Sequence, residues 1–385
     1  MRFQDINGHK EIIDSLRALA DSGKIPHALL FSGVPGIGKM QTARAFAQYL
    51  HCKNHINGDS CGVCPSCLQH QNHNSPDLHF SYPVVKKDKT VISKDFIDAW
   101  REMLDQNPFM APEKWNEILK AGNSQPAIYV FESEDIISRA SLSAFQEDFK
   151  IFIIWLPEKM RIEAANKLLK IIEEPFEDTI FILVSNNDSK LLPTILSRTR
   201  RFNFKPLREN EVKQMLIKSG VDENIADEAA RISGGRMQKA HEIALHPEEI
   251  LEFSNFFKEI MRAAYVLNAK KLKELSEKIA AFGREKILRF LDYCARMIRE
   301  NYIYNYNIPS LVMMTADEAA FSSRFAPFIH DGNVEKLLDE FSRAERDIER
   351  NGNSKIVMFD LMLILSRLVR TQKATTLPGL EEYLW

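Results

Sequence analysis

A glycine-rich phosphate loop follows a short apolar run near the start of the chain. The run is Ala28-Leu29-Leu30-Phe31, the loop is Gly33-Val34-Pro35-Gly36-Ile37-Gly38-Lys39, and apolar residues then recur at helical spacing up to Leu50. Glycines let backbone N–H groups approach a phosphate at a helix N-terminus, where the helix dipole also favours an anion. This order of strand, loop and helix predicts an α/β nucleotide-binding fold. The residues expected to contact a nucleotide are Gly33, Gly36, Gly38 and Lys39.

Two positions that normally handle magnesium carry other residues. Met40 stands where a serine or threonine usually binds the ion, and a thioether is a poor ligand for a hard cation. A second apolar run, residues 151–154, should end in an aspartate, but Trp155 follows it. Glu158 is interpreted as a solvated loop carboxylate. The paired loss predicts a relative of ATPases with no magnesium-dependent ATP hydrolysis of its own.

Four of the five cysteines fall in one short window with metal-ligand spacing. In a cytosolic protein such a cluster favours a metal over disulfides. Four thiolates close a tetrahedron around Zn²⁺ and leave no open position for a catalytic water. The sequence therefore predicts a structural zinc module over residues 52–67, with the ligands Cys52, Cys61, Cys64 and Cys67. Four nearby histidines could each replace a cysteine, but are more simply interpreted as solvated: His51, His55, His70 and His73.

A third apolar run, residues 179–184, has the character of a middle strand in a parallel sheet. The helical pattern before it should end at Glu173-Glu174-Pro175, because a proline disfavours helix at the preceding residue. The arginine-rich segment 198–201 after it fits either a basic strand edge or an arginine that points to a neighbouring subunit. Residues 83–126, with two tryptophans, are interpreted as helices packed on the sheet, without a role.

These motifs together resemble the bacterial clamp-loader branch of the AAA+ proteins, and within that branch most closely the delta prime subunits of DNA polymerase III. The matching segments are residues 24–33, the four-cysteine module, 165–175 and 192–198. The resemblance implies an AAA+ module over residues 1–206, built as a parallel sheet flanked by helices with the zinc insertion. It also implies a small helical lid over residues 207–247 and an all-α collar domain over residues 248–385.

The resemblance also implies roles for single residues. Ser197-Arg198 matches a motif whose arginine reaches the ATP site of the adjacent subunit, so Arg198 is expected to be an arginine finger supplied in trans. The lid should carry a second arginine that senses nucleotide. Arg236 and Gln238 both lie near its place, and the choice between them stays open.

The implied function is that of a non-catalytic, stator-like subunit that supports ATP-driven loading of the sliding clamp onto primed DNA. Its expected partners are the gamma/tau ATPase subunits and the delta subunit, together with the clamp and DNA. The loop can still hold ATP or ADP, and Mg²⁺ is not expected. The first alternative is a catalytic gamma/tau-type subunit that recruits metal through Thr42 or Glu158. The second is a zinc-dependent nucleic-acid-binding module.

Charge and hydropathy narrow the class of protein further. A formal net charge of −2 argues against coating nucleic acid by bulk electrostatics. The sequence has no run of about 18 apolar residues, the length that a membrane-spanning helix needs. Its first residues lack the charged and then apolar order of a signal peptide. The expected location is the cytoplasm, in a hetero-oligomer.

Overall fold

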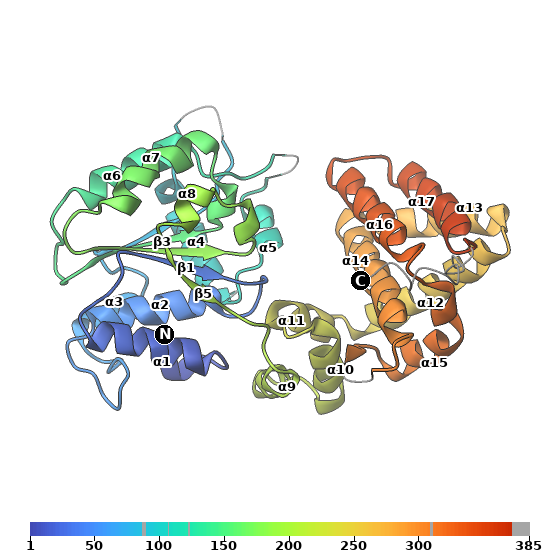
Figure 1. Cartoon of the computed structure of the whole chain (residues 1–385), viewed down its shortest axis with the longest axis horizontal. Helices are drawn as coiled ribbons and strands as arrows, with labels where there is room; N and C mark the ends of the chain where they lie inside the picture. Colours follow the sequence, from blue (N-terminus) through green and yellow to red (C-terminus); the bar gives the residue numbers. More distant parts are fainter. Residues whose placement is uncertain (87–89, 107, 122–123, 309–310, 372–385) are drawn as a thin grey trace, which may run out of the picture. The chain divides into compact units, whose positions relative to one another are not determined.

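The computed structural model describes residues 1–86, 90–106, 108–121, 124–308 and 311–371 (Figure 1). The chain divides into two compact units, Met1–Ala244 and Leu245–Trp385. Each unit has its own hydrophobic core. The predicted division at residues 206 and 247 stays a prediction, and the last part of the predicted collar, 372–385, lies outside the described residues.

A five-stranded, wholly parallel sheet forms the centre of the first unit. Its order is β2-β3-β4-β1-β5. The central strands are buried along their whole length, as their apolar sequences predict for a sheet covered on both faces. The strand bounds are β1 Ala28–Ser32, β2 Leu78–Ser81, β3 Lys150–Trp155, β4 Thr179–Ser185 and β5 Arg200–Asn203.

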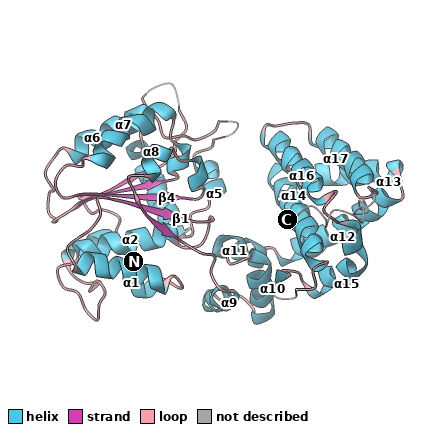
Figure 2. Cartoon of the chain, viewed as in Figure 1, coloured by secondary structure: helices cyan, strands magenta, loops and turns pink. Residues whose placement is uncertain are grey.

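Helices cover both faces of this sheet, with α6 and α7 on one side and α1 and α2 on the other (Figure 2). Alternate residues of β1 explain the two cores, because Leu29 and Phe31 join one cluster while Ala28 and Leu30 join the other. The predicted α/β architecture, a parallel sheet flanked by helices, is thereby confirmed. The helices are α1 Lys10–Asp21, α2 Lys39–His51, α3 Pro65–Gln71, α4 Ile97–Gln106, α5 Pro112–Ile118, α6 Val130–Ala140, α7 Ile162–Glu173 and α8 Pro193–Leu196.

The segment interpreted as helices packed on the sheet contains α4 and α5, whose tryptophans Trp100 and Trp115 are almost fully buried. Residues 87–89, 107 and 122–123 of that segment lie outside the described residues. Short 3-10 helices complete the first unit: η1 Phe3–Asp5, η2 Ser93–Phe96, η3 Pro157–Lys159 and η4 Asp188–Lys190.

Three helices at the end of the first unit form a small bundle with a separate apolar cluster. They are α9 Glu209–Lys218, α10 Glu223–Ser233 and α11 Met237–Leu245. The carboxylate of Asp222 caps α10 by accepting from two backbone N–H groups, and Gly234 ends that helix in the left-handed conformation. Gly235 must approach the carbonyl of Leu207 closely, since a Cβ there would lie 2.3 Å from that oxygen. The bundle is therefore tied to the chain that leaves β5.

The described part of the second unit is helical throughout. Its helices are α12 Pro247–Tyr265, α13 Ala269–Ala280, α14 Arg284–Tyr304, α15 Ala316–Phe325, η6 Ala326–Phe328, α16 Val334–Glu349 and α17 Ser354–Leu368. The Asn353 side chain caps α17 by accepting from the N–H groups of Lys355 and Ile356. None of the helices built from described residues combines the length and hydropathy that a bilayer crossing requires.

Candidate functional site

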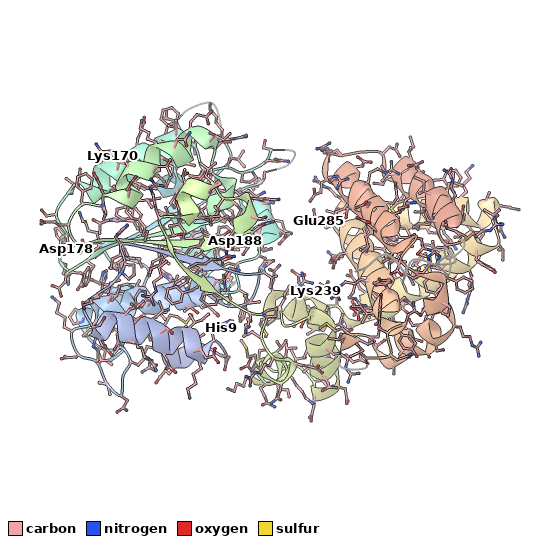
Figure 3. All side chains as sticks on the ribbon, viewed as in Figure 1. His9, Lys170, Asp178, Asp188, Lys239 and Glu285 are labelled. Atoms are coloured by element: carbon pink, nitrogen blue, oxygen red, sulfur yellow. The ribbon has the colours of Figure 1, made fainter. Side chains whose placement is uncertain are left out.

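The phosphate loop joins β1 to α2 and has the backbone shape that its glycines allow. Gly36 and Gly38 have φ values of 75° and 96°, which residues with a Cβ rarely adopt. On one flank the ring Nε2 of His9 lies 2.6 Å from the carbonyl oxygen of Ile37 and donates to it. Figure 3 labels His9, which precedes α1. The loop is thus held in a fixed conformation by its neighbours.

The ammonium group of Lys39 forms hydrogen bonds within the phosphate loop. Its Nζ donates to the carbonyl oxygens of Gly33 and Val34 at 2.7 and 2.5 Å, and the residue is only 4% exposed. Burial lowers the pKa of Lys39 to about 7, opposed by the nearby carboxylate of Glu158. A nucleotide phosphate would have to draw this group away from two carbonyls.

The first residues of α11 lie directly on the loop. The N–H of Gln238 donates to the carbonyl of Gly36 over 3.4 Å, and a Cβ on Gly36 would come within 2.6 Å of the Cβ of Gln238. Arg236 lies between α10 and α11, and its Nε donates to the carbonyl of Ser233, the last residue of α10, at 3.3 Å. Of the two residues left open from the sequence, the structure brings Gln238 to the loop.

Neither residue next to the loop offers a ligand for magnesium. Met40 is 3% exposed and belongs to the apolar core of the unit. The Thr42 hydroxyl is fully buried and donates to the carbonyl of Gly38 at 3.0 Å. The side chains that replace or neighbour the usual ligand are therefore built into the fold.

Trp155, at the end of β3, is buried and packs against an aromatic cluster. Its ring centroid lies 5.3 Å from that of Trp100, which also stacks on Tyr82 at 3.9 Å and contacts Trp115 at 5.4 Å. Such ring pairs add about 0.5–1.5 kcal/mol each beyond their buried area. The position of the expected aspartate has become part of an aromatic core, and the residues present there do not fit Mg²⁺.

Glu158 is not simply solvated, which corrects the interpretation from the sequence. Its carboxylate accepts from the Ser185 hydroxyl and from the N–H of Asn186, both at 2.9 Å. These bonds fix the end of β4 next to the phosphate loop. The carboxylate therefore has a structural task that sequence spacing could not reveal.

Arg198 lies just after α8 on the surface of the first unit, with its side chain 30% exposed. Its Nε donates to a carboxylate oxygen of Glu173 at 2.9 Å, and a terminal nitrogen donates to the carbonyl of Thr194 at 3.0 Å. Glu173 is the last residue of α7. The guanidinium is thus oriented by two partners while part of it faces solvent.

The four predicted cysteine ligands come together. Their sulfur atoms all lie within 4.8 Å of one another, and the Cys61 and Cys67 sulfurs are 3.9 Å apart. Four Zn–S bonds of about 2.3 Å set tetrahedrally would place sulfurs roughly 3.8 Å apart. The backbone N–H of Val63 is the largest cause that lowers the pKa of Cys61 to about 6, which favours the thiolate that a metal needs, whereas burial raises the pKa of Cys52 and of Cys67. The group can hold a metal ion.

The nearby histidines have other partners. His51 and His70 are buried and share a ring hydrogen bond of 2.8 Å, and the second nitrogen of His51 donates to Phe149 O at 3.0 Å. The interpretation of these two as solvated was therefore wrong. His55 bonds to Tyr49 O, and His73 bonds to Asp105.

A rigid loop with exposed apolar side chains was missed in the sequence. The buried carboxylate of Asp77 accepts from the backbone N–H groups of residues 145, 146 and 147, at 2.7 to 2.9 Å. Buried Lys150 donates to the carbonyls of Ala140 and Leu142. Between these anchors Phe145 is 84% exposed and Leu142 64% exposed. Asp77 and Lys150 carried no signal in sequence because their partners are backbone atoms, which every residue type has, and those of Asp77 are also distant in the chain.

Asp188 was also missed. Figure 3 labels it in η4, the turn that follows β4. Its carboxylate accepts from the Ser32 hydroxyl at 2.6 Å and pairs with Arg201. It thereby joins the ends of β1 and β5 beside the phosphate loop.

Comparisons with known proteins add a family to this geometry. A family model described as "DNA polymerase III, delta subunit" matches residues 8–208, more than half of the chain. The gamma/tau subunit of DNA polymerase III from Mycobacterium tuberculosis H37Rv is 30% identical over 216 residues, which are 56% of this chain and 31% of that protein. The delta' subunit from Bacillus subtilis 168 is 28% identical over 206 residues, 54% of this chain and 50% of that protein.

The matched region covers about a third to a half of these curated relatives. Both gamma/tau and delta' subunits are among them, so the similarity includes both kinds of subunit. Among solved structures, a gamma subunit-related protein of Thermotoga maritima is 13% identical with a TM-score of 0.38, covering 93% of this chain and 99% of that one. That likeness is too distant to support an argument about function.

Proposed function

The chain belongs to the DNA polymerase III, delta subunit family, and from that premise we propose that it is a non-catalytic, delta prime type subunit of the bacterial clamp loader. In this role it supports ATP-driven loading of the sliding clamp onto primed DNA, in the cytoplasm. Its partners are the gamma/tau ATPase subunits and the delta subunit. The chain contributes a rigid frame and contacts to its neighbours.

One observation carries the proposal: both magnesium positions are occupied by side chains that the fold needs elsewhere. Met40 is part of the apolar core, and Trp155 is part of the aromatic cluster with Trp100. A single lost ligand could be replaced by a neighbour, but Thr42 and Glu158 are both bound to backbone or side-chain groups. The contacts of these two residues also weigh against the gamma/tau-type alternative.

The decisive experiment measures ATP turnover by the purified chain with and without Mg²⁺. We expect no ATP turnover above the blank, either for the purified wild-type chain or for its Lys39→Ala variant. Magnesium-dependent turnover by the chain alone that disappears in Lys39→Ala would overturn the proposal. In the reconstituted loader, Lys39→Ala in this chain should leave the ATPase rate within about twofold of wild type.

Arg198 is proposed to act in trans on the ATP site of a neighbouring subunit. The ion pair with Glu173 and the hydrogen bond to Thr194 orient the guanidinium at the surface. A side chain that contacts a phosphate of another chain needs such an orientation. Such an arginine is worth about 10³–10⁵ in rate in related phosphoryl transfers. Arg198→Ala should fold and assemble normally, while the loader loses at least about tenfold in ATPase rate.

The matched control for this test is Arg200→Ala, which removes an exposed arginine two residues further on. It should leave the loader's ATPase rate unchanged. If Arg198→Ala and Arg200→Ala behave alike, Arg198 is not an arginine finger.

We propose that the metal held by the four cysteines is zinc and that its role is structural. The all-thiolate set suits Zn²⁺ and leaves no position for water. Asp59, inside the module, accepts from the N–H groups of Phe3 and Gln4 at 3.2 and 2.8 Å, so the module also anchors the start of the chain. Metal analysis should find one zinc per chain, lost in Cys61→Ser and kept in Cys294→Ser. A natively purified chain without metal would reject the site.

The exposed pair Leu142 and Phe145 is proposed to contact a partner protein of the assembly. The anchors Asp77 and Lys150 fix the loop before binding, which removes part of the entropy cost of association. Exposed aromatic residues of this kind are common binding hot spots, worth about 2 kcal/mol or more. The second alternative, a zinc-dependent nucleic-acid-binding module, has less support. It gives no role to the loop with Leu142 and Phe145 or to the phosphate loop.

A further inference from the structure

A groove with aromatic walls runs along the second unit between α12, α15 and the end of α17. One part of it has a volume of about 550 Å³, and a second part of about 630 Å³ shares Tyr265, Phe328 and Val369 with the first. The Tyr265 and Phe328 rings meet edge to face at 5.0 Å. The Phe321 and Phe325 rings stack on each other at 5.1 Å. The two parts therefore form one groove that apolar side chains can fill.

The rim of the groove carries more positive than negative charge. Arg262 and Arg324 line the first part and Arg370 lines the second, and all three are exposed. Among the described lining residues the one carboxylate, Asp317, already pairs with Lys258 at 2.5 Å. Within the described part of the chain, none of the three arginines forms an ion pair. The groove therefore offers three guanidinium groups to a negatively charged partner.

The turn after α12 holds an apolar side chain outward at the groove wall. Leu267 lines the second part of the groove and has a φ of 56°, the left-handed conformation in which glycine or asparagine is usual after a helix. The N–H of Leu267 donates to the carbonyl of Ala264, and that of Asn268 donates to the carbonyl of Ala263, so the turn is fixed. Leu267 is nevertheless 53% exposed and its neighbour Val266 68% exposed. Exposed apolar residues in a fixed turn indicate a contact with another molecule.

The chemistry of the groove favours a peptide over a nucleic acid. Bases bind single-strand-binding proteins by stacking on free aromatic faces. Here the rings of Phe321 and Phe325 already stack on each other, and Tyr265 already packs against Phe328. Apolar side chains need only the volume and the apolar walls, and carboxylates pair well with guanidinium groups. The complementary partner is therefore a protein segment that combines acidic residues with bulky apolar ones.

We propose that this groove binds an acidic, amphipathic segment of a partner protein, with the carboxylates of that segment on Arg262 and Arg324. Its apolar side chains lie against Tyr265, Leu267 and Phe328. Apolar anchors that enter a groove are a common mode of peptide recognition. The groove belongs to the second unit alone and shares no residue with the sites described above, so its test is independent of the proposed function.

The test measures binding of the fluorescein-labelled peptide Glu-Glu-Leu-Phe-Glu-Glu-Leu-Phe to the full chain, by fluorescence anisotropy at about 0.15 M salt. We expect saturable binding that is at least about tenfold tighter than binding of the same peptide with lysine in place of each glutamate. Arg262→Glu combined with Arg324→Glu should reverse this preference, because the reversed rim pairs with lysine. The matched control is Arg350→Glu combined with Lys355→Glu, which makes the same charge change at exposed positions near the opposite end of α17. It should change the affinity by less than about twofold.

Leu267→Asn separates a docking role of this residue from a structural one. Asparagine suits the left-handed φ of the turn, so the melting temperature of the second unit should stay within about 2 °C of wild type. Binding of the acidic peptide should nevertheless weaken several-fold, because an apolar contact is lost. Unchanged affinity would remove Leu267 from the proposed surface.

Other outcomes overturn the proposal as a whole. The first is the absence of saturable binding, or equal binding of the acidic and the basic peptide. The second is an acidic peptide that binds the Arg262→Glu and Arg324→Glu double variant as tightly as it binds wild type. Displacement of the peptide by an equal concentration of single-stranded oligo-dT would assign the groove to nucleic acid. Self-association of the chain in sedimentation experiments, if the same double variant abolishes it, would assign the groove to a second copy.

Discussion

At the scale of single residues, Trp155 shows what a replaced catalytic position can become. Its ring is 1% exposed and packs against Trp100, which in turn contacts Tyr82 and Trp115. The position could not return to an aspartate without burying a carboxylate between aromatic rings, which is costly unless the charge is paired. Packing therefore keeps an aspartate out of this position.

Trp155→Asp should destabilise the first unit by about 3–5 kcal/mol or more, the usual cost of removing a buried tryptophan. It should not create ATPase activity. Urea unfolding followed by circular dichroism measures the change. Ile162→Asp, at a position that is 67% exposed at the start of α7 in the same unit, serves as the control and should change stability by less than about 0.5 kcal/mol. A stable Trp155→Asp variant would show that the aromatic cluster is not a constraint.

His79 gives a pH dependence at the same scale. Burial lowers the pKa of His79 to about 4, with Arg139 lowering it further and the carboxylates of Asp77 and Asp135 opposing this. The unfolded chain binds a proton below about pH 6.5, and the folded chain does so only near pH 4. Between these values the unfolded state binds more protons, so this contribution to stability is full above pH 6.5 and is lost as the pH falls toward 4.

From pH 6.5 to pH 5 the loss due to His79 should reach up to about 2 kcal/mol, at about 1.36 kcal/mol for each pKa unit. Urea unfolding of the wild type and of His79→Gln at a series of pH values measures it. The variant should show a smaller fall in the free energy of unfolding over this range. His246→Gln, an exposed histidine with its side chain 54% accessible, should keep the wild-type slope. Equal slopes for all three chains would contradict the prediction.

At the scale of elements, α17 combines a buried side with an exposed apolar stripe. Met358, Leu361, Met362 and Leu365 are at most 1% exposed, whereas Ile356 and Leu363, seven residues apart, are 68% and 40% exposed. Positions i and i+7 lie on the same face of a helix. The helix therefore buries one side within this chain, and we propose that its exposed apolar stripe contacts a neighbouring subunit.

Leu363→Asp should weaken assembly of the loader by about tenfold or more, since burying a leucine is worth about 1.5–3 kcal/mol. The isolated chain should keep its stability, because the side chain is already partly exposed. Analytical ultracentrifugation of mixtures with the partner subunits measures the effect. Lys355→Asp at the start of the same helix is the control. Unchanged assembly of Leu363→Asp would exclude this face from the interface.

At the scale of the whole molecule, the two units have separate cores. The clusters around Phe46 and Ile153 in the first unit and around Phe257 and Leu361 in the second have no residue in common. Separate cores favour two unfolding transitions rather than one. The four-cysteine group belongs to the first unit, and Cys294 belongs to the core of the second.

Differential scanning calorimetry should therefore resolve two transitions. Cys61→Ser, which removes a proposed zinc ligand, should lower only the transition of the first unit by several degrees, since about 1 kcal/mol shifts a domain of 150–250 residues by about 2–4 °C. Cys294→Ser should lower only the other transition. A single transition that both variants shift would show that the units unfold together.

Much of the first unit could be predicted because its elements are apolar over several residues. The central strands β1, β3 and β4 and the helix ending at Glu173 follow from local patterns. Strand β2 could not be found, because it has four residues, of which only Ser81 is fully buried. It becomes a strand by pairing with β3, and that pairing is a contact between distant segments.

The sequence by itself determined which chemistry is missing and which is present. Met40 and Trp155 are not magnesium ligands and Cys61 is a thiol wherever the chain places them, because a side chain's donor atoms are set by its covalent structure. Only the tertiary structure decided what these groups do: that Trp155 enters an aromatic core, that Glu158 binds the end of β4, and that Gln238 rather than Arg236 meets the loop. These outcomes depend on contacts between residues far apart in the chain, and such contacts exist only once the elements have packed.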